Sequence, residues 1–227
     1  MAKDVGFENT AGPEGHQAVA FRSQSEQSVL YNCHFDGYQD TLYAQTHRQF
    51  YRDCTISGTV DFIFGDATAI FQNCVMVVRK PMANQQNIVT AHGSTKPNED
   101  TVYVLQNCTI TAEPALVPLI SENPTYLGRP WKAYARTIIL QSQIDGLVHP
   151  DGWMPWENSP DSINTCYYSE IDNRGPGAAK DRRVKWPGVK NLDIVTGNMY
   201  SLEVLFKGGD WVKRSGVPFL ARMASSS

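Results

Sequence analysis

Short runs of alternating apolar and polar residues recur along the chain, and four of them share one pattern around a cysteine. The pattern is apolar, polar, Asn or Asp, Cys, any residue, apolar, and the cysteines are 21, 20 and 34 residues apart. The four copies are VLYNCHFDG (29–37), QFYRDCTISG (49–58), AIFQNCVMVV (69–78) and YVLQNCTITA (103–112). A weaker fifth copy, IILQSQIDG (138–146), has Ser142 in the cysteine position, and KDVGFEN (3–9) looks like a sixth. A structural unit of about 20 residues therefore repeats.

Periods near 20 residues are typical of solenoids, in which each coil buries its apolar side chains against its neighbours. Within each copy β-branched and aromatic residues alternate between Gly, Asn, Asp and Pro, which predicts strands. Helical periodicity is weak through residues 1–170, and the Leu-x-x-Leu-x-Leu pattern of leucine-rich repeats is missing. The sequence therefore predicts an all-β fold, a right-handed parallel β-helix in which Asn, Cys and aliphatic side chains stack from coil to coil.

Two intervals between repeat copies, and the C-terminal region, depart from the 20-residue period. The 34-residue steps are predicted to be coils with longer loops, such as residues 80–100. After Trp186 the pattern becomes loop-like, and residues 192–211 are predicted to hold one or two short helices. We interpret residues 187–227 as a strap along the solenoid, so that residues 1–227 form a single domain.

The repeat also places two acidic residues. Asp40 and Asp61 each lie seven residues after a cysteine, Cys33 and Cys54 respectively, whereas the next coil has Pro81 at that position. If the coils stack in register, the two carboxylates lie about 5 Å apart on adjacent coils. Two carboxylates that close do not both ionise readily, so one pKa rises, which suits an acid/base and a nucleophile. The alternative is that each Asp is an ordinary turn residue at a corner of the solenoid.

Composition excludes several other classes of function. The net charge of −3 and the pI near 5.9 do not favour nucleic acid or an anionic membrane as a partner. No apolar run approaches the roughly 18 residues of a membrane span. The five cysteines form no Cys-x-x-Cys pair, so no zinc site is expected, and neither is a metal or cofactor of any other kind. The absence of Gly-x-Ser-x-Gly argues against a serine esterase.

Four segments in order resemble the plant pectin methylesterases (pectinesterases), and the resemblance runs from about residue 3 to residue 220. They are GPEGHQAVAF, with Phe21 where the family has Leu, then GYQDTLYA, GTVDFIFG and YLGRPW. Each segment is moderately specific, and the four in this order are very specific. The resemblance implies a carboxylic ester hydrolase that releases methanol from the C6 methyl ester of homogalacturonan.

The resemblance also implies roles for individual residues. Asp61 would be the nucleophile, and Asp40 the general acid for the leaving methanol and then the base for water. Gln17 and Gln39 would donate amide N–H groups to the oxyanion, and Arg129 would pair with Asp61. Without the motifs, Gln17 would read as a stacked interior amide and Arg129 as a surface ion pair.

Aromatic residues would line the substrate groove. By resemblance these are Tyr43, Phe64 and Trp131, with Trp153 in DGWMPW as a further candidate for the same wall. The alternatives stay open: Tyr43 and Phe64 are also consistent with ordinary stacks of the solenoid, and Trp131 with a plug beneath its loop.

The cysteines acquire an interpretation from the resemblance as well. It favours a disulfide between Cys74 and Cys108. Cys33 and Cys54 either pair or remain stacked thiols, and Cys166 has no evident partner. Since the family is secreted to the plant cell wall or by microbes, oxidising conditions are expected.

Further expectations concern the chain ends and partners. The family's Gly-x-Tyr-x-Glu segment is missing, so the N-terminal coils are expected to be absent, with lower stability as a consequence. A monomer that binds methyl-esterified homogalacturonan is expected, and a small helical proteinaceous inhibitor is a further candidate partner.

Two other functions remain as alternatives. β-Helix folds also host glycosidases and lyases that cleave polygalacturonan, and carboxylates about 5 Å apart suit a retaining glycosidase. The second alternative is an inactive remnant that binds pectin or the inhibitor without turnover.

Overall fold

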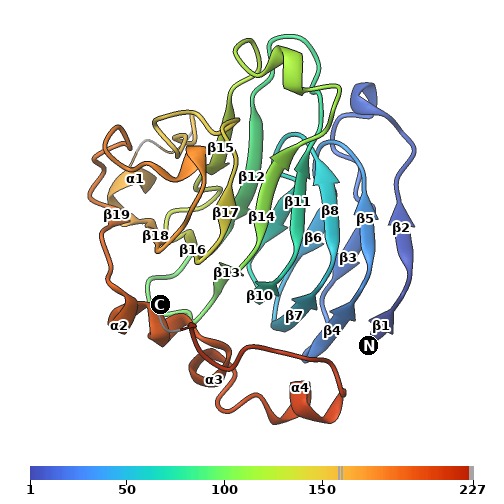
Figure 1. Ribbon diagram of the computed structural model, residues 1–227, viewed down its shortest axis with the longest axis vertical. Coiled ribbons are helices and arrows are strands. Elements are labelled where there is room, and N and C mark those ends of the chain that lie inside the picture. The colour runs from blue at the N-terminus through green and yellow to red at the C-terminus, as the bar shows by residue number, and fades with distance from the viewer. Residues whose placement is uncertain (158, 160, 225–227) are drawn as a thin grey trace.

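The computed structural model describes residues 1–157, 159 and 161–224, which wind into a parallel β-helix with three faces (Figure 1). The first sheet comprises, in spatial order, β1 (Ala2–Lys3), β4 (Ser28–Tyr31), β7 (Arg48–Arg52), β10 (Thr68–Gln72), β13 (Val102–Gln106), β16 (Arg136–Leu140), β18 (Tyr167–Ile171) and β19 (Val189–Lys190). The second comprises β2 (Gly6–Glu8), β5 (His34–Asp36), β8 (Thr55–Gly58), β11 (Val75–Val78), β14 (Thr109–Ala112) and β17 (Gln143–Ile144). The third comprises β3 (Phe21–Ser23), β6 (Leu42–Ala44), β9 (Ile63–Gly65), β12 (Asn87–His92) and β15 (Thr125–Gly128).

The described helices are short and gather mostly in the C-terminal region. They are α1 (Ser162–Thr165), α2 (Ile194–Gly197), α3 (Leu202–Leu205) and α4 (Asp210–Arg214), with 3₁₀ turns at Pro13–Gly15, Val117–Leu119, Pro176–Ala178 and Asn198–Tyr200. The prediction of a right-handed parallel β-helix with a tail of loops and short helices is confirmed. Within the described residues, no helix has the length and apolar character needed to cross a bilayer.

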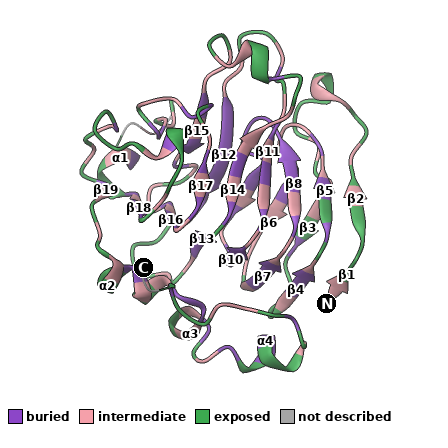
Figure 2. Cartoon of the chain, viewed as in Figure 1, coloured by how far each residue is buried: buried purple, intermediate pink, exposed green. Residues whose placement is uncertain are grey.

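Both faces of the central strands of the first sheet are buried, which explains their continuous apolar sequences. Tyr51 faces the interior of the solenoid, whereas its neighbour Phe50 faces outward, and neither is exposed. The outward row packs against the C-terminal region through Leu202, Trp211 and Val212. Figure 1 shows the segment with α3 and α4 running below the strands. Figure 2 shows the resulting contrast between the buried central strands and the exposed N-terminal strand β2. The tail therefore covers a second apolar layer outside the coils.

The repeat around the cysteines forms the corner between the first and second sheets. Strand register places the four cysteines above one another, and Ser142 continues the column by accepting a hydrogen bond from the Cys108 N–H at 3.0 Å. In each coil, the residue directly before the cysteine position adopts a left-handed conformation with φ between 50° and 57°. These residues are Asp4, Asn32, Asp53, Asn73, Asn107, Gln141 and Asp172. Asn and Asp tolerate this conformation better than other L-residues, so the corner explains their place in the repeat.

The expected disulfide between Cys74 and Cys108 is absent, because both are free, buried thiols. Stacking in register separates the two Cβ atoms by about one strand spacing, ~4.8 Å, whereas a disulfide needs about 3.8 Å. Each thiol instead donates to a carbonyl of the preceding coil, Cys74 to Tyr51 at 3.6 Å and Cys108 to Phe71 at 3.4 Å. Burial raises the pKa of the Cys74 thiol well above its usual value, so this thiol is unreactive.

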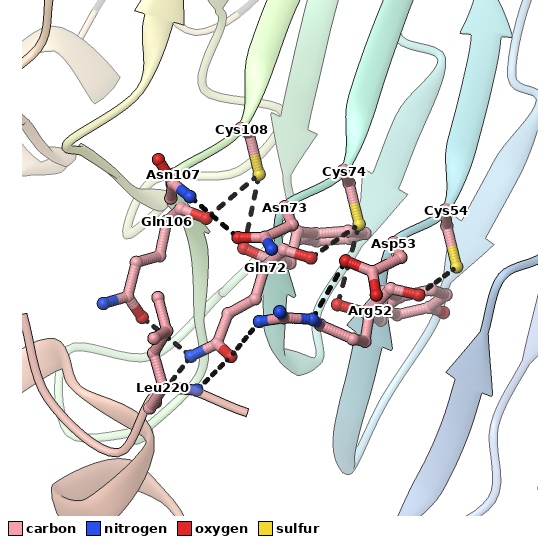
Figure 3. A network of polar contacts seen from close by, with 12 residues as sticks. Arg52, Asp53, Cys54, Gln72, Asn73, Cys74, Gln106, Asn107, Cys108 and Leu220 are labelled. Carbon is pink, nitrogen blue, oxygen red and sulfur yellow. Dashed lines mark hydrogen bonds and ion pairs between the residues drawn. The ribbon is translucent and has the colours of Figure 1, made fainter. Parts of the chain in front are cut away.

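Glutamine side chains fasten the last described segment to the first sheet (Figure 3). The Gln72 amide donates to the Leu220 carbonyl at 2.7 Å and accepts from the Leu220 N–H at 2.8 Å. Gln141 makes the same pair of bonds with Ala224, at 2.8 and 2.9 Å. Between them, Gln106 donates to the carbonyl of Arg222 at 3.1 Å. The amides therefore bind the backbone of this extended segment as a neighbouring strand would.

Candidate active site

Asp40 and Asp61 lie at the corner between the second and third sheets, in the turns that lead into β6 and β9. The pairs Asp36–Ser57 and Leu42–Ile63 flank them with the same 21-residue offset, so the two aspartates face each other on adjacent coils. Both have positive φ, 63° for Asp40 and 50° for Asp61. As at the cysteine corners, Asp tolerates this left-handed conformation better than most residues, so it suits both turns. The structure thus brings the two predicted acids together.

Arg129 follows β15 and reaches back over two coils to Asp61. Its Nε donates to Asp61 Oδ1 at 2.8 Å and its Nη2 to Oδ2 at 2.7 Å, a bidentate pair. The other face of the guanidinium lies 4.2 Å from the ring centroid of Trp156. This pair is not the surface ion pair of the alternative interpretation, because only 9% of the Asp61 side chain is exposed.

The surroundings of the two carboxyl groups favour the protonated form of Asp40 and the charged form of Asp61. Burial and the neighbouring charge of Asp61 raise the pKa of Asp40 to about 7, with Arg129 opposing the rise. Burial also raises the pKa of Asp61, but the hydrogen bonds and charge of Arg129 act against it. Because the guanidinium donates to both oxygens of Asp61 and stabilises its charged form, a proton held by the pair resides on Asp40. Asp40 is therefore equipped as an acid, and Asp61 as a carboxylate.

The two aspartates open into a cavity of about 330 Å³. It is lined by Gln17, Gln39, Asp40, Asp61, Phe64, Ala91, Arg129, Trp131 and Trp156. Gln17 is exposed, which excludes the interior amide stack, and its loop is tied to the turn that carries Asp40 by the bond from the Ala18 N–H to the Gln39 carbonyl at 3.1 Å. Two amide side chains, two carboxyl groups and one guanidinium thus converge on one space.

Stacked aromatic rings form one wall of this cavity. Phe64 lies between Tyr43, with ring centroids 4.3 Å apart and nearly parallel, and Trp131, which meets it edge-on at 6.0 Å. A Cβ atom at Gly93 would lie 2.6 Å from the Trp131 ring, so only glycine lets that ring pack against the backbone there. Tyr43 is absent from the cavity lining and supports Phe64 from behind.

Trp153 is wrongly predicted as part of the wall. It is 1% exposed and stacks on Tyr168 inside the solenoid, with ring centroids 4.3 Å apart. A parallel bridge to Gly128 continues the third sheet at Trp153 and directs its side chain inward. Trp156, three residues later and missed from the sequence, lines the cavity instead. The only signal was the second tryptophan of DGWMPW.

A larger groove, of about 1040 Å³, lies between the start of several first-sheet strands and the tail. Its arginines already have protein partners: Arg48 pairs with Glu26, and Arg136 donates to the carbonyls of Pro97 and Glu99. Its lining does not include the aspartate pair. Among the described residues, no group of three or more His, Cys, Asp or Glu side chains is arranged to hold a metal ion. The predicted pair of acids therefore lies in the smaller cavity and not in the larger groove.

Comparison with known proteins identifies relatives of this chain. The Pectinesterase family model matches residues 1–209. "Probable pectinesterase/pectinesterase inhibitor 58" of Arabidopsis thaliana is 53% identical over 219 residues, which are 96% of this chain and 38% of that protein. The "Pectinesterase" of Petunia integrifolia is 50% identical over 225 residues, 98% of this chain and 60% of that protein. The structure of pectin methylesterase from carrot is 43% identical with a TM-score of 0.95, covering 97% of this chain and 69% of that chain.

The match covers nearly the whole chain, although the chain spans only about two fifths or less of the first curated relatives it matches. The motifs that carry the resemblance are the ones that supply the cavity with Gln17, Gln39, Asp40, Asp61 and Arg129. On the family match, the sequence identity and the shared fold, this chain belongs to the pectinesterase family.

Proposed function

We propose that this chain hydrolyses the C6 methyl esters of homogalacturonan, releasing methanol and leaving a free carboxylate. The observation that carries the proposal is the stacked pair of Asp40 and Asp61, with the bidentate Arg129 bound to Asp61 alone. A proton on one carboxyl and a negative charge on the other are what a covalent esterase of this kind needs.

In the first step, an oxygen of the Asp61 carboxylate attacks the ester carbonyl carbon, and the carbonyl electrons move onto its oxygen. The amide N–H groups of Gln17 and Gln39 stabilise this oxyanion, each worth about 3 kcal/mol in comparable sites. When the carbonyl re-forms, the bond to the methoxy oxygen breaks, and protonated Asp40 gives its proton to that oxygen. Methanol leaves, and the acyl group remains on Asp61.

In the second step, Asp40 is now a carboxylate and accepts a proton from water as the water oxygen attacks the same carbon. The bond to Asp61 breaks, and its electrons return to the Asp61 carboxylate, which Arg129 again stabilises. Asp40 ends the cycle protonated, and the product acid loses its proton to solvent. Ester and water thus become carboxylate, proton and methanol, with the two aspartates regenerated.

Aromatic rings beside the cavity favour a sugar polymer as substrate. Phe64, Trp131 and Trp156 present apolar faces on which pyranose rings pack, next to the acids. A pectin methylesterase structure in complex with a hexasaccharide is 27% identical to this chain with a TM-score of 0.71, which supports an oligosaccharide in the corresponding groove. We propose action in the plant cell wall or extracellular space, and a proteinaceous inhibitor that covers the cavity, since relatives bear the name pectinesterase/pectinesterase inhibitor.

The test is product analysis on methyl-esterified pectin. We expect methanol and titratable acid without new reducing ends, and an Asp61→Ala variant that still folds but releases no methanol. Chain scission would instead support the glycosidase, and an unsaturated product the lyase. Pectin binding without turnover, unchanged by Asp61→Ala, would support the inactive remnant.

A further inference from the structure

A row of four residues ends the second sheet just before the corner that carries the aspartates. Tyr38, Thr59, Arg79 and Glu113 follow paired strand residues in successive coils. Backbone bonds from the Arg79 N–H to the Gly58 carbonyl and from the Glu113 N–H to the Val78 carbonyl, both at 2.8 Å, continue the register just beyond the strands. In the two coils that carry the acids, Tyr38 lies two residues before Asp40 and Thr59 two residues before Asp61.

Arg79 extends along this row, past Thr59, to the coil that carries Asp40. Its Nη1 donates to the Gly37 carbonyl at 3.0 Å and its Nη2 to the Tyr38 hydroxyl at 2.9 Å. The guanidinium lies 3.9 Å from the centroid of the Tyr38 ring. From the other side, Glu113 approaches Arg79 Nε at 3.4 Å. Because only 25% of the Arg79 side chain is exposed, these charge-assisted contacts are partly shielded from water.

The turn at residues 37–41, which Arg79 contacts, is also held by hydrogen bonds of its own Thr41 side chain. The Thr41 hydroxyl lies 2.8 Å from the Ser57 carbonyl and 3.2 Å from the Tyr38 carbonyl. A Cβ atom at Gly37 would lie 2.7 Å from the Thr41 hydroxyl oxygen, so the turn is closed against that side chain. Asp40, at φ 63°, lies directly before Thr41 in the same turn. Contacts that hold Gly37, Tyr38 and Thr41 therefore also help to fix the position of Asp40.

We propose that Arg79 is a positioning residue of the active site. By holding Gly37 and Tyr38, its guanidinium keeps the following Gln39 and Asp40 directed into the cavity. The proposal rests on the proposed function, and it assigns Arg79 no contact with substrate, because Arg79 does not line the cavity. Small displacements of catalytic groups lower rates strongly, by about 10²-fold for 1 Å. The guanidinium fork serves both partners at once, which a lysine ammonium does less well.

An experiment can distinguish positioning by Arg79 from an effect of its charge on the pKa of Asp40. The charges that shift the pKa of Asp40 are those of Asp61 and Arg129. Replacing Arg79 should therefore lower kcat without moving the pH dependence, whereas an electrostatic role would move it.

The experiment compares Arg79→Gln and Arg79→Lys with a matched control, Arg48→Gln. Arg48 also bonds a glutamate of the neighbouring coil and is 31% exposed, but it lies on the first sheet. Initial rates of methanol release give kcat, KM and their pH profiles below all melting temperatures. Hydrogen exchange at the Asp40 amide, which donates to the Val60 carbonyl at 3.0 Å, reports the order of the turn without requiring activity.

For Arg79→Gln we expect kcat to fall about tenfold, KM to stay within about twofold and exchange at Asp40 to accelerate about tenfold. Arg79→Lys should fall between this variant and the wild type, and Arg48→Gln should match the wild type. Unchanged exchange at Asp40, unchanged kcat or an equal loss in Arg48→Gln would overturn the proposal. A wild-type protein that releases no methanol would refute the proposed function instead, and the exchange comparison would still decide the role of Arg79.

Discussion

Replacement of Arg129 by glutamine should move the proton of the aspartate pair to the wrong carboxyl. In the wild type, two hydrogen bonds from Arg129 at 2.8 and 2.7 Å favour the charged form of Asp61, so Asp40 carries the proton. Glutamine keeps one donor at most and removes the charge. Since burial raises the pKa of both acids, Asp61 then competes with Asp40 for the same proton.

The magnitude follows from the burial of the pair. Removing one partner of a buried ion pair typically costs about 3–5 kcal/mol, and we take the lower end because 19% of the Arg129 side chain is exposed. About 3 kcal/mol corresponds to a factor of about 100 in the ratio of the two protonation arrangements. The productive arrangement, with Asp61 charged and Asp40 protonated, should therefore become up to about 100-fold rarer.

The assay is kcat/KM for methanol release between pH 5 and 9, with Arg174→Gln as the control for loss of an exposed arginine. We expect up to about a 100-fold loss for Arg129→Gln at every pH, because changing the pH alters the number of protons on the pair and not their distribution. Arg129→Lys should lose less. Full recovery of the variant at high pH, or an effect confined to KM, would refute this reasoning.

Three further predictions concern the acid, the tryptophans and the tail. Because the pKa of Asp40 rises from 3.8 to about 7 on folding, its contribution to stability is complete below pH 3.8 and is lost as the pH rises through 7. Urea unfolding should therefore show Asp40→Asn gaining stability relative to the wild type at pH 8 but not at pH 3.5. Trp156→Ala should raise KM with little change in melting temperature, whereas Trp153→Ala should lose about 3–5 kcal/mol of unfolding free energy. Gln72→Ala together with Gln106→Ala should free the C-terminal segment, seen as proteolysis of the tail and a loss of about 1–3 kcal/mol.

Each of these has a result that would contradict it. A stability difference between Asp40→Asn and the wild type that is the same at both pH values would show that the Asp40 pKa is not raised. Equal effects of the two tryptophan changes on KM would contradict the inward orientation of Trp153. A tail that resists protease in the double glutamine variant would show that the apolar contacts of α3 and α4 suffice to hold it.

The solenoid and its pair of acids were predictable because they depend on the strand register between adjacent coils. The spacing of the sequence repeat sets that register. The corner residue before each cysteine has φ near 50°, a requirement that Asn and Asp meet and that the sequence therefore displays. A constant offset from that corner then places Asp40 beside Asp61 without any knowledge of the loops.

Side-chain direction was less predictable than register. Trp153 and Trp156 share one short segment, and only the bridge between Gly128 and Trp153 decides that the first faces inward. Stacking of Cys74 on Cys108 was foreseeable from the repeat, but the repeat does not show that parallel stacking holds their Cβ atoms too far apart for a bridge. Arg79 left no local signal, because its partners Gly37 and Tyr38 lie about 40 residues away and two coils back.

The remaining site residues come from coils that are longer than the 20-residue period. The two coils that keep the short period supply Asp40 and Asp61, with Gln39 and Phe64 beside them in the cavity. Arg129 and Trp131 come from the loop after β15, and Trp156 from the segment beyond it, where the spacing has lengthened to 34 residues. Since a loop of any length satisfies the stacking of its coil, its sequence is free to carry groups that reach back over earlier coils. In this chain the regular coils place the acids side by side, and the irregular ones complete the cavity around them.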